Sequence, residues 1–294
     1  MSAKHPVIAV TGSSGAGTTT VKRAFEHIFR RENITAAIIE GDSMHSLDRK
    51  AFKEAVAKAE KAGKRAPSHF GPEANHFAKI EEMFKEYGQK GSCMRRYYIH
   101  SEEEGKPWKQ EPGTFTPFQR IEKGTDLLFY EGLHGGVQDG KIDVAKYVDL
   151  LVGVVPIVNL EWIQKIHRDA AERGYAADVI VDTIMRRMPD YVNYITPQFS
   201  RTHVNFQRVP TVDTSNPFIA RDIPTPDESF IVIRFRREIA DTVDFPYLLN
   251  MIPNSFMSRP NTMVVPGGKM GFAMELILTP MIHDMIAKKK KAKK

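Results

Sequence analysis

A glycine-rich turn near the start of the chain constrains the fold more than any other feature of the sequence. The apolar run Val7–Val10 leads directly into Thr11–Thr20 (TGSSGAGTTT), and this turn opens the amphipathic stretch Thr18–Arg31. Where a strand, a glycine-rich turn and a helix follow one another in this way, backbone N–H groups and the helix N-terminus bind phosphate oxygens. We therefore predict a loop that binds the phosphates of ATP. The residues expected to contact ATP are Gly12, Ser13, Ser14, Gly15, Ala16, Gly17, Thr18, Thr19 and Thr20.

The spacing within this turn matches that of phosphate loops, with one departure. Gly12, Gly17 and Thr19 occupy the expected positions, and the hydroxyl of Thr19 is the expected Mg²⁺ ligand. Thr18 stands where such loops usually carry a lysine. A dinucleotide-binding turn is disfavoured, because Thr20 occupies the position of its third glycine. The remaining alternative is a Gly-Ser turn that binds nothing.

Short apolar runs alternate with longer amphipathic stretches along most of the chain. This alternation predicts an α/β fold of the P-loop NTPase kind, with a mainly parallel sheet, helices on both faces and irregular insertions. The expected strands are Val7–Val10, Ala36–Glu40, Leu127–Glu131, Val148–Val155, Phe230–Phe235 and Thr262–Val265. The expected helices are Thr18–Arg31, Leu47–Ala62, His76–Tyr87, one or two within 159–196, and Ala273–Ala287. We expect residues 1–287 to form a single domain, with a polar, irregular excursion at 91–125.

Charge and cysteine content narrow the class of protein. The formal net charge is +6, but six lysines lie in residues 288–294, so the rest of the chain is formally neutral. We expect this lysine-rich tail to be a frayed, solvated end, and we expect no nucleic-acid partner. No apolar run approaches the roughly 18 residues of a membrane-spanning helix, and no signal peptide fits before Val7. A single cysteine, Cys93, excludes an internal disulfide and fits a reducing cytoplasm.

Two acidic residues follow predicted strands on the side of the sheet that carries the phosphate loop. Asp42 lies in Glu40–Ser43 (EGDS), and Glu131 ends the apolar run that starts at Leu127. Ligands of open α/β sheets bind at the carboxyl ends of the strands. Phosphoryl transfer to a hydroxyl needs an acid that positions the metal and a base that accepts the proton. Glu131 is therefore expected to orient Mg²⁺ and Asp42 to act on the acceptor, although either could be an exposed loop carboxylate or a helix cap.

A first set of basic residues follows Asp42. His45, Arg49 and Lys53 recur every four residues, which would place them on one face of a helix. Such a stripe suits an acceptor that already carries a phosphate group, and we predict that these residues bind it. A solvated surface face is a nearly equal alternative, because further lysines surround the stripe.

A second set of charges lies within Asn159–Arg173 (NLEWIQKIHRDAAER). Three cations around one acid suggest a lid that closes over the polyphosphate and stabilises charge in the transition state. The lid could replace the missing lysine of the phosphate loop, whereas the side chain of Lys22 is expected to point away. The alternative is a ladder of i,i+4 salt bridges on the helix surface. The predicted lid residues are Lys165, Arg168, Asp169 and Arg173.

Taken together, these segments resemble the phosphoribulokinase family, and within it the short bacterial class. The resemblance covers nearly the whole chain. Its carriers include three late motifs that would by themselves be interpreted as loops and turns, namely Ile195–Ser200, Asn205–Phe218 and Val264–Met270. The other carriers are Thr11–Thr20, Glu40–Asp42, Leu128–Gly136 and Gly153–Asp169. A threonine in place of the loop lysine is normal in this class, so Thr18 does not indicate an inactive protein.

The resemblance implies an enzyme that transfers the γ-phosphoryl group of ATP to the C1 hydroxyl of ribulose 5-phosphate, giving the ribulose 1,5-bisphosphate of the Calvin cycle. It implies that Asp42 is the catalytic base and Glu131 the metal-associated acid. His45 and Arg49 would contact the sugar phosphate, and the charged helix would be a mobile catalytic lid. A kinase for another sugar phosphate or a nucleoside remains an alternative, because uridine kinases resemble the same scaffold. A non-catalytic ATP sensor is a third possibility, although the expected acidic residues are present.

The resemblance also implies an assembly and its regulation. Bacterial members are large homo-oligomers that NADH activates and AMP inhibits. Three arginines match residues of such an effector site, namely Arg221, Arg234 and Arg259. Plant-type members are switched by a dithiol near the phosphate loop, which Cys93 alone cannot form.

Overall fold

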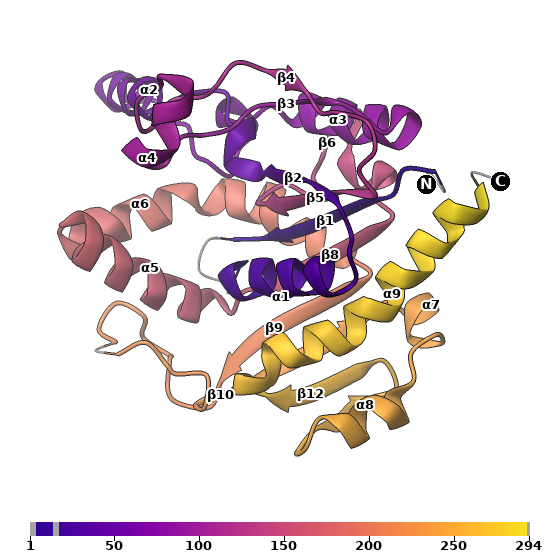
Figure 1. Ribbon diagram of the computed structural model, residues 1–294. Helices are drawn as coiled ribbons and strands as arrows, with labels where there is room; N and C mark the ends of the chain where they lie inside the picture. The colour runs from indigo at the N-terminus through magenta and orange to yellow at the C-terminus, as the bar shows by residue number, and fades with distance from the viewer. Residues whose placement is uncertain (1–3, 14–17, 221, 293–294) are drawn as a thin grey trace.

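The computed structural model describes residues 4–13, 18–220 and 222–292, and its centre is an eight-stranded sheet (Figure 1). The strands are β1 (Val7–Gly12), β2 (Ala36–Glu40), β5 (Leu127–Gly132), β8 (Leu150–Val155), β9 (Val204–Pro210), β10 (Ser229–Phe235), β11 (Phe256–Arg259) and β12 (Thr262–Pro266). Their order across the sheet is β11-β12-β10-β9-β8-β1-β5-β2. The five strands from β9 to β2 run parallel, and β10, β12 and β11 continue the sheet in antiparallel pairs. The predicted α/β fold is confirmed.

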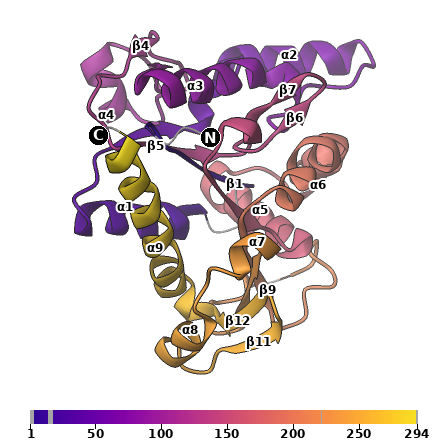
Figure 2. The same ribbon diagram turned by 90° about the vertical axis from the view of Figure 1, so that its right-hand side faces the viewer.

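Helices lie on both faces of the sheet and beyond its carboxyl edge (Figures 1 and 2). They are α1 (Thr18–Arg31), α2 (Arg49–Lys61), α3 (Phe77–Lys90), α4 (Glu102–Gly105), α5 (Val158–Arg173), α6 (Ala177–Asp190), α7 (Arg237–Ala240), α8 (Phe245–Met251) and α9 (Met270–Ala292). Two small hairpins complete the fold, formed by β3 (Met94–Arg95) with β4 (Gln119–Arg120) and by β6 (Gln138–Asp139) with β7 (Ile142–Asp143). The polar segment 91–125 contributes the first hairpin and α4, and it is otherwise irregular, as predicted.

Strand β1 illustrates why the parallel strands are continuous apolar runs. Val7 and Ala9 belong to the apolar cluster that includes α3, whereas Ile8 and Val10 belong to the cluster that includes α1 and α9. Successive side chains of a strand point to opposite faces of the sheet. A strand that is covered on both faces therefore needs apolar residues at every position. The central position of β1 in turn fixes where the phosphate loop begins.

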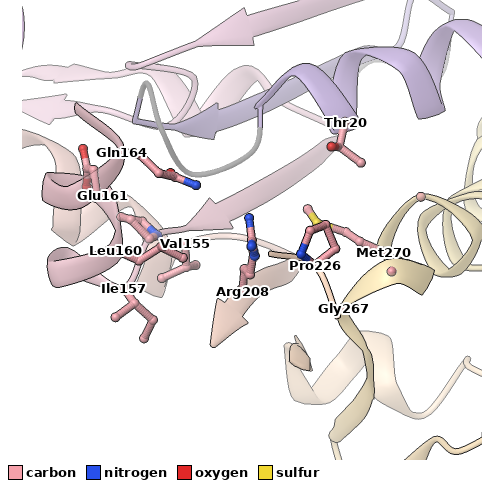
Figure 3. A pocket seen from close by; sticks show the side chains of 13 residues that line it. Thr20, Val155, Ile157, Leu160, Glu161, Gln164, Arg208, Pro226, Gly267 and Met270 are labelled. Carbon is pink, nitrogen blue, oxygen red and sulfur yellow. The ribbon is translucent and has the colours of Figure 1, made fainter. Parts of the chain in front are cut away.

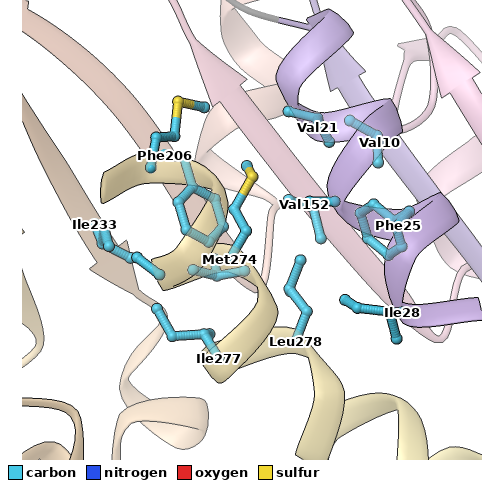
Figure 4. Close-up of a cluster of buried hydrophobic side chains, with 14 of the residues drawn as sticks. Val10, Val21, Phe25, Ile28, Val152, Phe206, Ile233, Met274, Ile277 and Leu278 are labelled. Carbon is cyan, nitrogen blue, oxygen red and sulfur yellow. The ribbon is translucent and has the colours of Figure 1, made fainter. Parts of the chain in front are cut away.

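The larger apolar cluster fills the space between the sheet and the helix pair α1 and α9 (Figure 4). Val21, Phe25 and Ile28 lie on the predicted apolar face of α1 and are fully buried. Met274 and Leu278 of α9 point into the same cluster. The C-terminal helix thereby holds the first helix against the sheet, and so supports the phosphate loop from the side.

The last helix covers most of Gly267–Lys291, a stretch that is long and apolar enough to cross a membrane. Ala273, Ile277 and Ile282 are buried in the larger apolar cluster, against α1 and the sheet. A core helix of a globular domain has the same apolar character. We therefore interpret α9 as a core helix, and no other stretch of the described residues has the length and composition of a membrane span.

The late motifs differ from the loops and turns that their sequences suggest in isolation. The first residues of Asn205–Phe218 belong to β9, which lies between β8 and β10. Val264–Met270 contains the end of β12 and the first residue of α9, and Thr196–Ser200 forms a 3₁₀ helix. Strand β11 at the edge of the sheet was likewise not predicted.

The lysine-rich end also differs from its prediction. Helix α9 continues to Ala292, so residues 288–292 are helical and not frayed. The Lys289 side chain is buried, and its amine donates to the backbone carbonyls of Thr125, at 2.9 Å, and Asp126, at 2.6 Å. These acceptors lie far away in the sequence, at the start of β5. A run of lysines could not reveal them.

We predict that Lys289→Met lowers the free energy of unfolding by about 1–3 kcal/mol, the usual contribution of hydrogen bonds to a charged group. Methionine keeps the aliphatic length of the side chain and removes its donors. The matched control is Lys290→Met, at an exposed position of the same helix, which should change stability by less than about 0.5 kcal/mol. Chemical denaturation measures both. Equal effects of the two variants would show that the contact with β5 contributes nothing.

Candidate active site

The phosphate loop begins where β1 ends, and its first glycine is required by packing. A Cβ atom at Gly12 would lie 2.8 Å from the carbonyl oxygen of Val154 in β8. Ser13 is buried next to it, and α1 begins at Thr18. The predicted ATP contacts that lie outside the described part of the chain are Ser14, Gly15, Ala16, Gly17 and the side chains of Thr18 and Thr19.

A pocket of about 180 Å³ opens beside the first turn of α1 (Figure 3). Thr20 lies at its border, next to the phosphate loop. One wall is apolar and comes from the end of β8 and the start of α5, including Pro156 and Leu160. The opposite wall contains Gly267 and Met270, where the chain enters α9, and Arg208 of β9 projects between the two (Figure 3). The lining of the pocket thus combines apolar side chains with the polar side chains of Glu161, Gln164 and Arg208.

The turn that follows β2 touches the last residue of β5 at the carboxyl edge of the sheet. A Cβ atom at Gly41 would lie 2.7 Å from the Cα atom of Gly132, so this approach requires glycine. In the strand register Glu40 pairs with Glu131. Asp42 follows in the 3₁₀ turn after β2. This contact therefore gathers three carboxylates beside the end of β1.

The electrostatics of this edge favour a cation. Burial, together with the negative charges of Asp42 and Glu40, raises the pKa of Glu131 to about 7. Mg²⁺ binds through one or two carboxylates together with substrate phosphates, and a bound cation would favour the ionised form of Glu131. The carboxylates present thus fit the predicted role of Glu131 in holding the metal.

Lys22 faces the same edge, and the prediction that its side chain points away is wrong. Its amine lies 2.9 Å from a carboxylate oxygen of Glu40, and its positive charge also acts on Glu131. The hydrogen bond with Glu40 raises the pKa of Lys22, so the amine stays charged. Because α1 starts directly after the phosphate loop, Lys22 supplies a cation one turn from the position of the missing lysine.

Asp42 is paired with His45 in a defined orientation. Their nearest atoms, Asp42 Oδ1 and His45 Nε2, are 3.4 Å apart. The other ring nitrogen of His45 lies 2.8 Å from Oδ1 of Asn75. The amide nitrogen of Asn75 donates to the carbonyls of His69 and Gly71, so its oxygen faces the ring and His45 Nδ1 is the donor. When Nε2 also carries a proton, it points at Asp42.

The surroundings keep Asp42 ionised and keep the nearby rings of His69 and His134 uncharged. Desolvation raises the pKa of Asp42, but the hydrogen bond from His45 and the charges of His45 and His100 lower it by more, so the net shift is downward. Burial lowers the pKa of His69 to about 3 and that of His134 to about 3, so both rings are neutral at neutral pH. Asp42 is therefore ionised at neutral pH, which is the form of a carboxyl group that can accept a proton.

Two residues that sequence reasoning missed hold this arrangement. The His69 ring stacks on Phe52 of α2 at 3.9 Å and lies 4.6 Å from the His45 ring. Arg96, from the irregular segment, donates to the backbone carbonyls of Ser43, at 2.7 Å, and His45, at 2.5 Å. The guanidinium of Arg96 thus fixes the turn that carries Asp42. No local pattern identifies Arg96, whereas His69 lies in a loop rich in Gly, Pro and His.

The predicted basic stripe after Asp42 does not form one helical face. His45 has extended backbone angles after the 3₁₀ turn, and α2 starts at Arg49. Arg49 and Lys53 share a face of α2 and are both exposed. The backbone N–H of Arg49 donates to the carbonyl of Gly113 at 2.9 Å, which ties α2 to the irregular segment. The period of four residues was a coincidence for His45, because a 3₁₀ turn and an extended residue precede the helix.

The charged helix α5 has the expected cluster around Asp169. Lys165 hydrogen-bonds to Asp169, and Arg168 Nε lies 3.2 Å from its other oxygen. Asp169 is buried, and burial also lowers the pKa of Lys165. The contact between Lys165 and Asp169 is the i,i+4 pair that sequence reasoning offered as an alternative. The side chain of Arg173, at the end of the helix, lies outside the described part of the chain.

At the base of α5, a buried acid joins the helix to the rest of the site. Burial raises the pKa of Glu161, while the hydrogen bond from Tyr191 and the charges of Lys165 and Arg168 oppose this effect. The Tyr191 hydroxyl lies 3.1 Å from Glu161 Oε2. Glu161 therefore connects the start of α5 with the segment that follows α6, and the sequence analysis did not single it out.

Two of the three predicted effector arginines are close neighbours in the sheet. Arg234 of β10 and Arg259 of β11 both pair with Thr262, which lies on β12 between them. Both arginines are exposed. They lie at the antiparallel end of the sheet, away from the turns that carry Asp42 and Glu131. Arg221 lies outside the described residues.

Comparisons with known proteins agree with this geometry. Residues 7–215 match the model of the phosphoribulokinase / uridine kinase family. The chromosomal phosphoribulokinase of Cupriavidus necator is 59% identical over 292 residues, which cover 99% of each chain. The phosphoribulokinase of Nitrobacter vulgaris is 57% identical over 98% of this chain and 99% of its own. A solved structure of phosphoribulokinase from Rhodobacter spheroides superposes with a TM-score of 0.90 and 50% identity, over 98% of this chain and 100% of that chain.

We predict that Glu131→Gln stabilises the ligand-free protein at pH 8 but hardly at pH 5. A carboxyl whose pKa rises from 4.5 to about 7 on folding holds its proton more tightly in the folded state. Wild-type stability therefore falls as the pH rises from about 4.5 through about 7, and glutamine removes this loss. We expect a gain of about 1–2 kcal/mol at pH 8. Denaturation in EDTA measures it, with the exposed Glu122→Gln as control. A gain that is equal at both pH values would contradict the assignment.

Proposed function

We propose that this chain, which belongs to the phosphoribulokinase / uridine kinase family, transfers the γ-phosphoryl group of ATP to the C1 hydroxyl of ribulose 5-phosphate. The product is ribulose 1,5-bisphosphate, the carbon dioxide acceptor of the Calvin cycle. One observation of the structure carries the proposal. An ionised Asp42, paired with His45, lies at the same carboxyl edge as the phosphate loop and the metal-associated acid Glu131.

Asp42 is the base in this proposal. As the C1 oxygen attacks the γ-phosphorus, its O–H bond breaks and the proton passes to the Asp42 carboxylate. The new bond joins the sugar oxygen to phosphorus, and the bond to the β–γ bridging oxygen breaks, so ADP leaves with that electron pair. His45 holds the carboxylate in place, and Arg96 holds the turn that carries both.

Charge on the transferred group is balanced from two sides. Lys165 and Arg168 of the lid helix and Lys22 of α1 are the proposed cations that replace the loop lysine. Mg²⁺, when bound to ATP, would contact Glu131 and the hydroxyl of Thr19, and would neutralise charge on the phosphate oxygens. Arg173, at the end of the same helix, completes the proposed lid.

ATP binds with its base in the pocket beside Thr20. The apolar wall from Pro156 and Leu160 suits one face of adenine, and the glycines that precede α9 allow close approach on the other. Arg208 is held there by hydrogen bonds to Ser229 Oγ, at 3.0 Å, and to the carbonyl of Pro224. The pocket opens next to the phosphate loop, which the triphosphate requires.

The phosphate of the acceptor is bound by Arg49 and Lys53, with His45 nearer to the reacting end. Both basic side chains are exposed on α2, the helix that follows the turn with Asp42 and His45. A nucleoside acceptor has no phosphate that would use them. This argument favours the sugar-phosphate kinase over the uridine kinase alternative, and the paired base argues against a non-catalytic sensor.

The proposal includes assembly and regulation. We propose one domain over residues 1–287, a cytoplasmic homo-oligomer, activation by NADH and inhibition by AMP. Arg234 and Arg259 support an anionic effector, because both flank Thr262. Cys93 is fully buried, and burial raises its pKa to about 12, so a thiol switch at this residue is not expected.

An assay of ADP release with a panel of acceptors tests the function. The panel contains ribulose 5-phosphate, ribose 5-phosphate, fructose 6-phosphate, glycerate and uridine. We expect kcat/KM to be highest for ribulose 5-phosphate, by at least about 10²-fold, since a misplaced hydroxyl loses much of the rate. Mass spectrometry should find a pentulose bisphosphate. Turnover of uridine alone would establish the nucleoside kinase, and ATP binding without turnover would establish the sensor.

Substitution of the two candidate bases tests the roles within the site. Asp42→Asn keeps the shape and removes the basicity, so kcat should fall by at least about 10²-fold with little change in either KM. Arg49→Gln should mainly raise KM for the sugar phosphate, because that contact exists before the reaction. Asp169 is the rival base, although it is buried between Lys165 and Arg168. If Asp42→Asn retains near-normal turnover while Asp169→Asn is inactive, the roles are reversed.

A further inference from the structure

We propose that Gln198 is a positioning residue that sets the phosphate loop and the Glu131 turn at a fixed distance from each other. It lies in the 3₁₀ helix Thr196–Ser200, inside a motif for which neither sequence spacing nor the proposed chemistry supplies a role. Its side chain is 1% exposed, and all of its hydrogen-bonding capacity is directed at backbone and side-chain groups of the site. The kinetic test of this inference rests on the proposed function. The test by nucleotide binding is independent of the proposed function.

The carbonyl oxygen of the Gln198 side chain connects two loops. It accepts a hydrogen bond from the Thr11 hydroxyl at 2.8 Å and another from the backbone N–H of Gly136 at 2.9 Å. Thr11 is the residue of β1 that immediately precedes Gly12 of the phosphate loop. Gly136 ends the turn that begins after Glu131.

The amide nitrogen of Gln198 makes the complementary connections. It donates to the carbonyl of Leu133 at 2.8 Å and to the carbonyl of Tyr194 at 2.7 Å. The Thr11 hydroxyl, whose single proton is directed at the Gln198 carbonyl oxygen, also lies 3.1 Å from the Leu133 carbonyl, so Thr11, Leu133 and Gln198 are in mutual contact. Tyr194 belongs to the π-helical segment that follows α6, and this segment joins the lid helices to the sheet.

These four contacts require an amide. Two acceptor interactions on one end and two donor interactions on the other match the two ends of a glutamine side chain. A carboxylate would place negative charge against two carbonyl oxygens, and an apolar side chain would leave buried donors and acceptors unpaired. The strand register already aligns Thr11 with Gly132, so the glutamine is not needed to position the strands themselves. It fixes the loops beyond the strand ends, where the phosphates and the metal acid must meet.

Gln198→Met tests the proposal, with Asn205→Leu as matched control. Asn205 is a nearby amide that accepts from Thr202 Oγ1 at 2.7 Å and donates to the carbonyl of Phe199 at 2.9 Å, so it ties down the same segment without touching Thr11 or the Glu131 turn. For Gln198→Met we expect kcat to fall by about 10- to 10²-fold, as for small misplacements in active sites. The Mg²⁺ concentration for half-maximal activity should rise, and KM for the sugar phosphate should stay within about twofold. Asn205→Leu should lower the melting temperature but leave kcat and the Mg²⁺ requirement within about twofold.

A double-mutant cycle keeps the test decisive even where Gln198→Met is poorly folded. Thr11→Val removes one partner of the glutamine and should reproduce the direction of its effects, whereas Thr11→Ser keeps the hydroxyl and should restore them. Adding Thr11→Val to Gln198→Met should cost little more, because the two residues act as one unit. Calorimetric titration with Mg·ATP reports loop placement without an acceptor, so a wrong acceptor assignment does not affect it. Loss of thermal stability alone, with kcat, Mg²⁺ requirement and Mg·ATP affinity equal to those of Asn205→Leu, would overturn the proposal.

Discussion

The close contact between the turn after β2 and the end of β5 is the constraint on which the rest of the site depends. Gly41 and Gly132 approach so closely that neither can carry a side chain. This contact brings Asp42, from one turn, beside the acid that ends the next strand. Parallel strands in register present their carboxyl ends at one edge. The contact between the two glycines brings two carboxylates close together at this edge, and each carboxylate has different neighbours.

The different neighbours assign the two carboxylates different chemistry. Burial raises the pKa of Asp42, but the hydrogen bond and charge of His45 and the charge of His100 outweigh it, so its net pKa shift is downward. Glu131 is buried next to negative charge, so its pKa is raised to about 7. A carboxylate that stays ionised without a metal can accept a proton from a substrate hydroxyl. A carboxylate that is fully ionised when a cation arrives is suited to hold that cation. In the proposed mechanism the environment, more than the residue type, separates the base from the metal ligand.

Much of this could be predicted from the sequence, because the informative signals are local. A buried strand, a glycine-rich turn and an amphipathic helix are neighbours in the chain, and acids at strand ends follow from the same pattern. The remaining features depend on long-range contacts. Lys289 is buried because two carbonyls at the start of β5 accept its protons. Arg96 reaches the Asp42 turn from an irregular segment. β9 was missed because only alternate residues of its chain, such as Val204 and Phe206, are buried.

In the proposed mechanism, Lys22, Lys165 and Arg168 compensate for the threonine in place of the loop lysine, and this would couple nucleotide binding to closure of the lid. Lys22 is held by Glu40, and Lys165 and Arg168 are held by Asp169, so these cations have local carboxylate partners in the structure described here. A lysine within the phosphate loop would meet the phosphates as soon as ATP entered. Cations that must first exchange a carboxylate for a phosphate gain less from ATP alone, since the lost salt bridge offsets part of the new one. They gain most when charge develops on the transferred group, because phosphate oxygens then outcompete the carboxylate. The exchange therefore favours the transition state over the bound ground state, which is the condition for a faster chemical step.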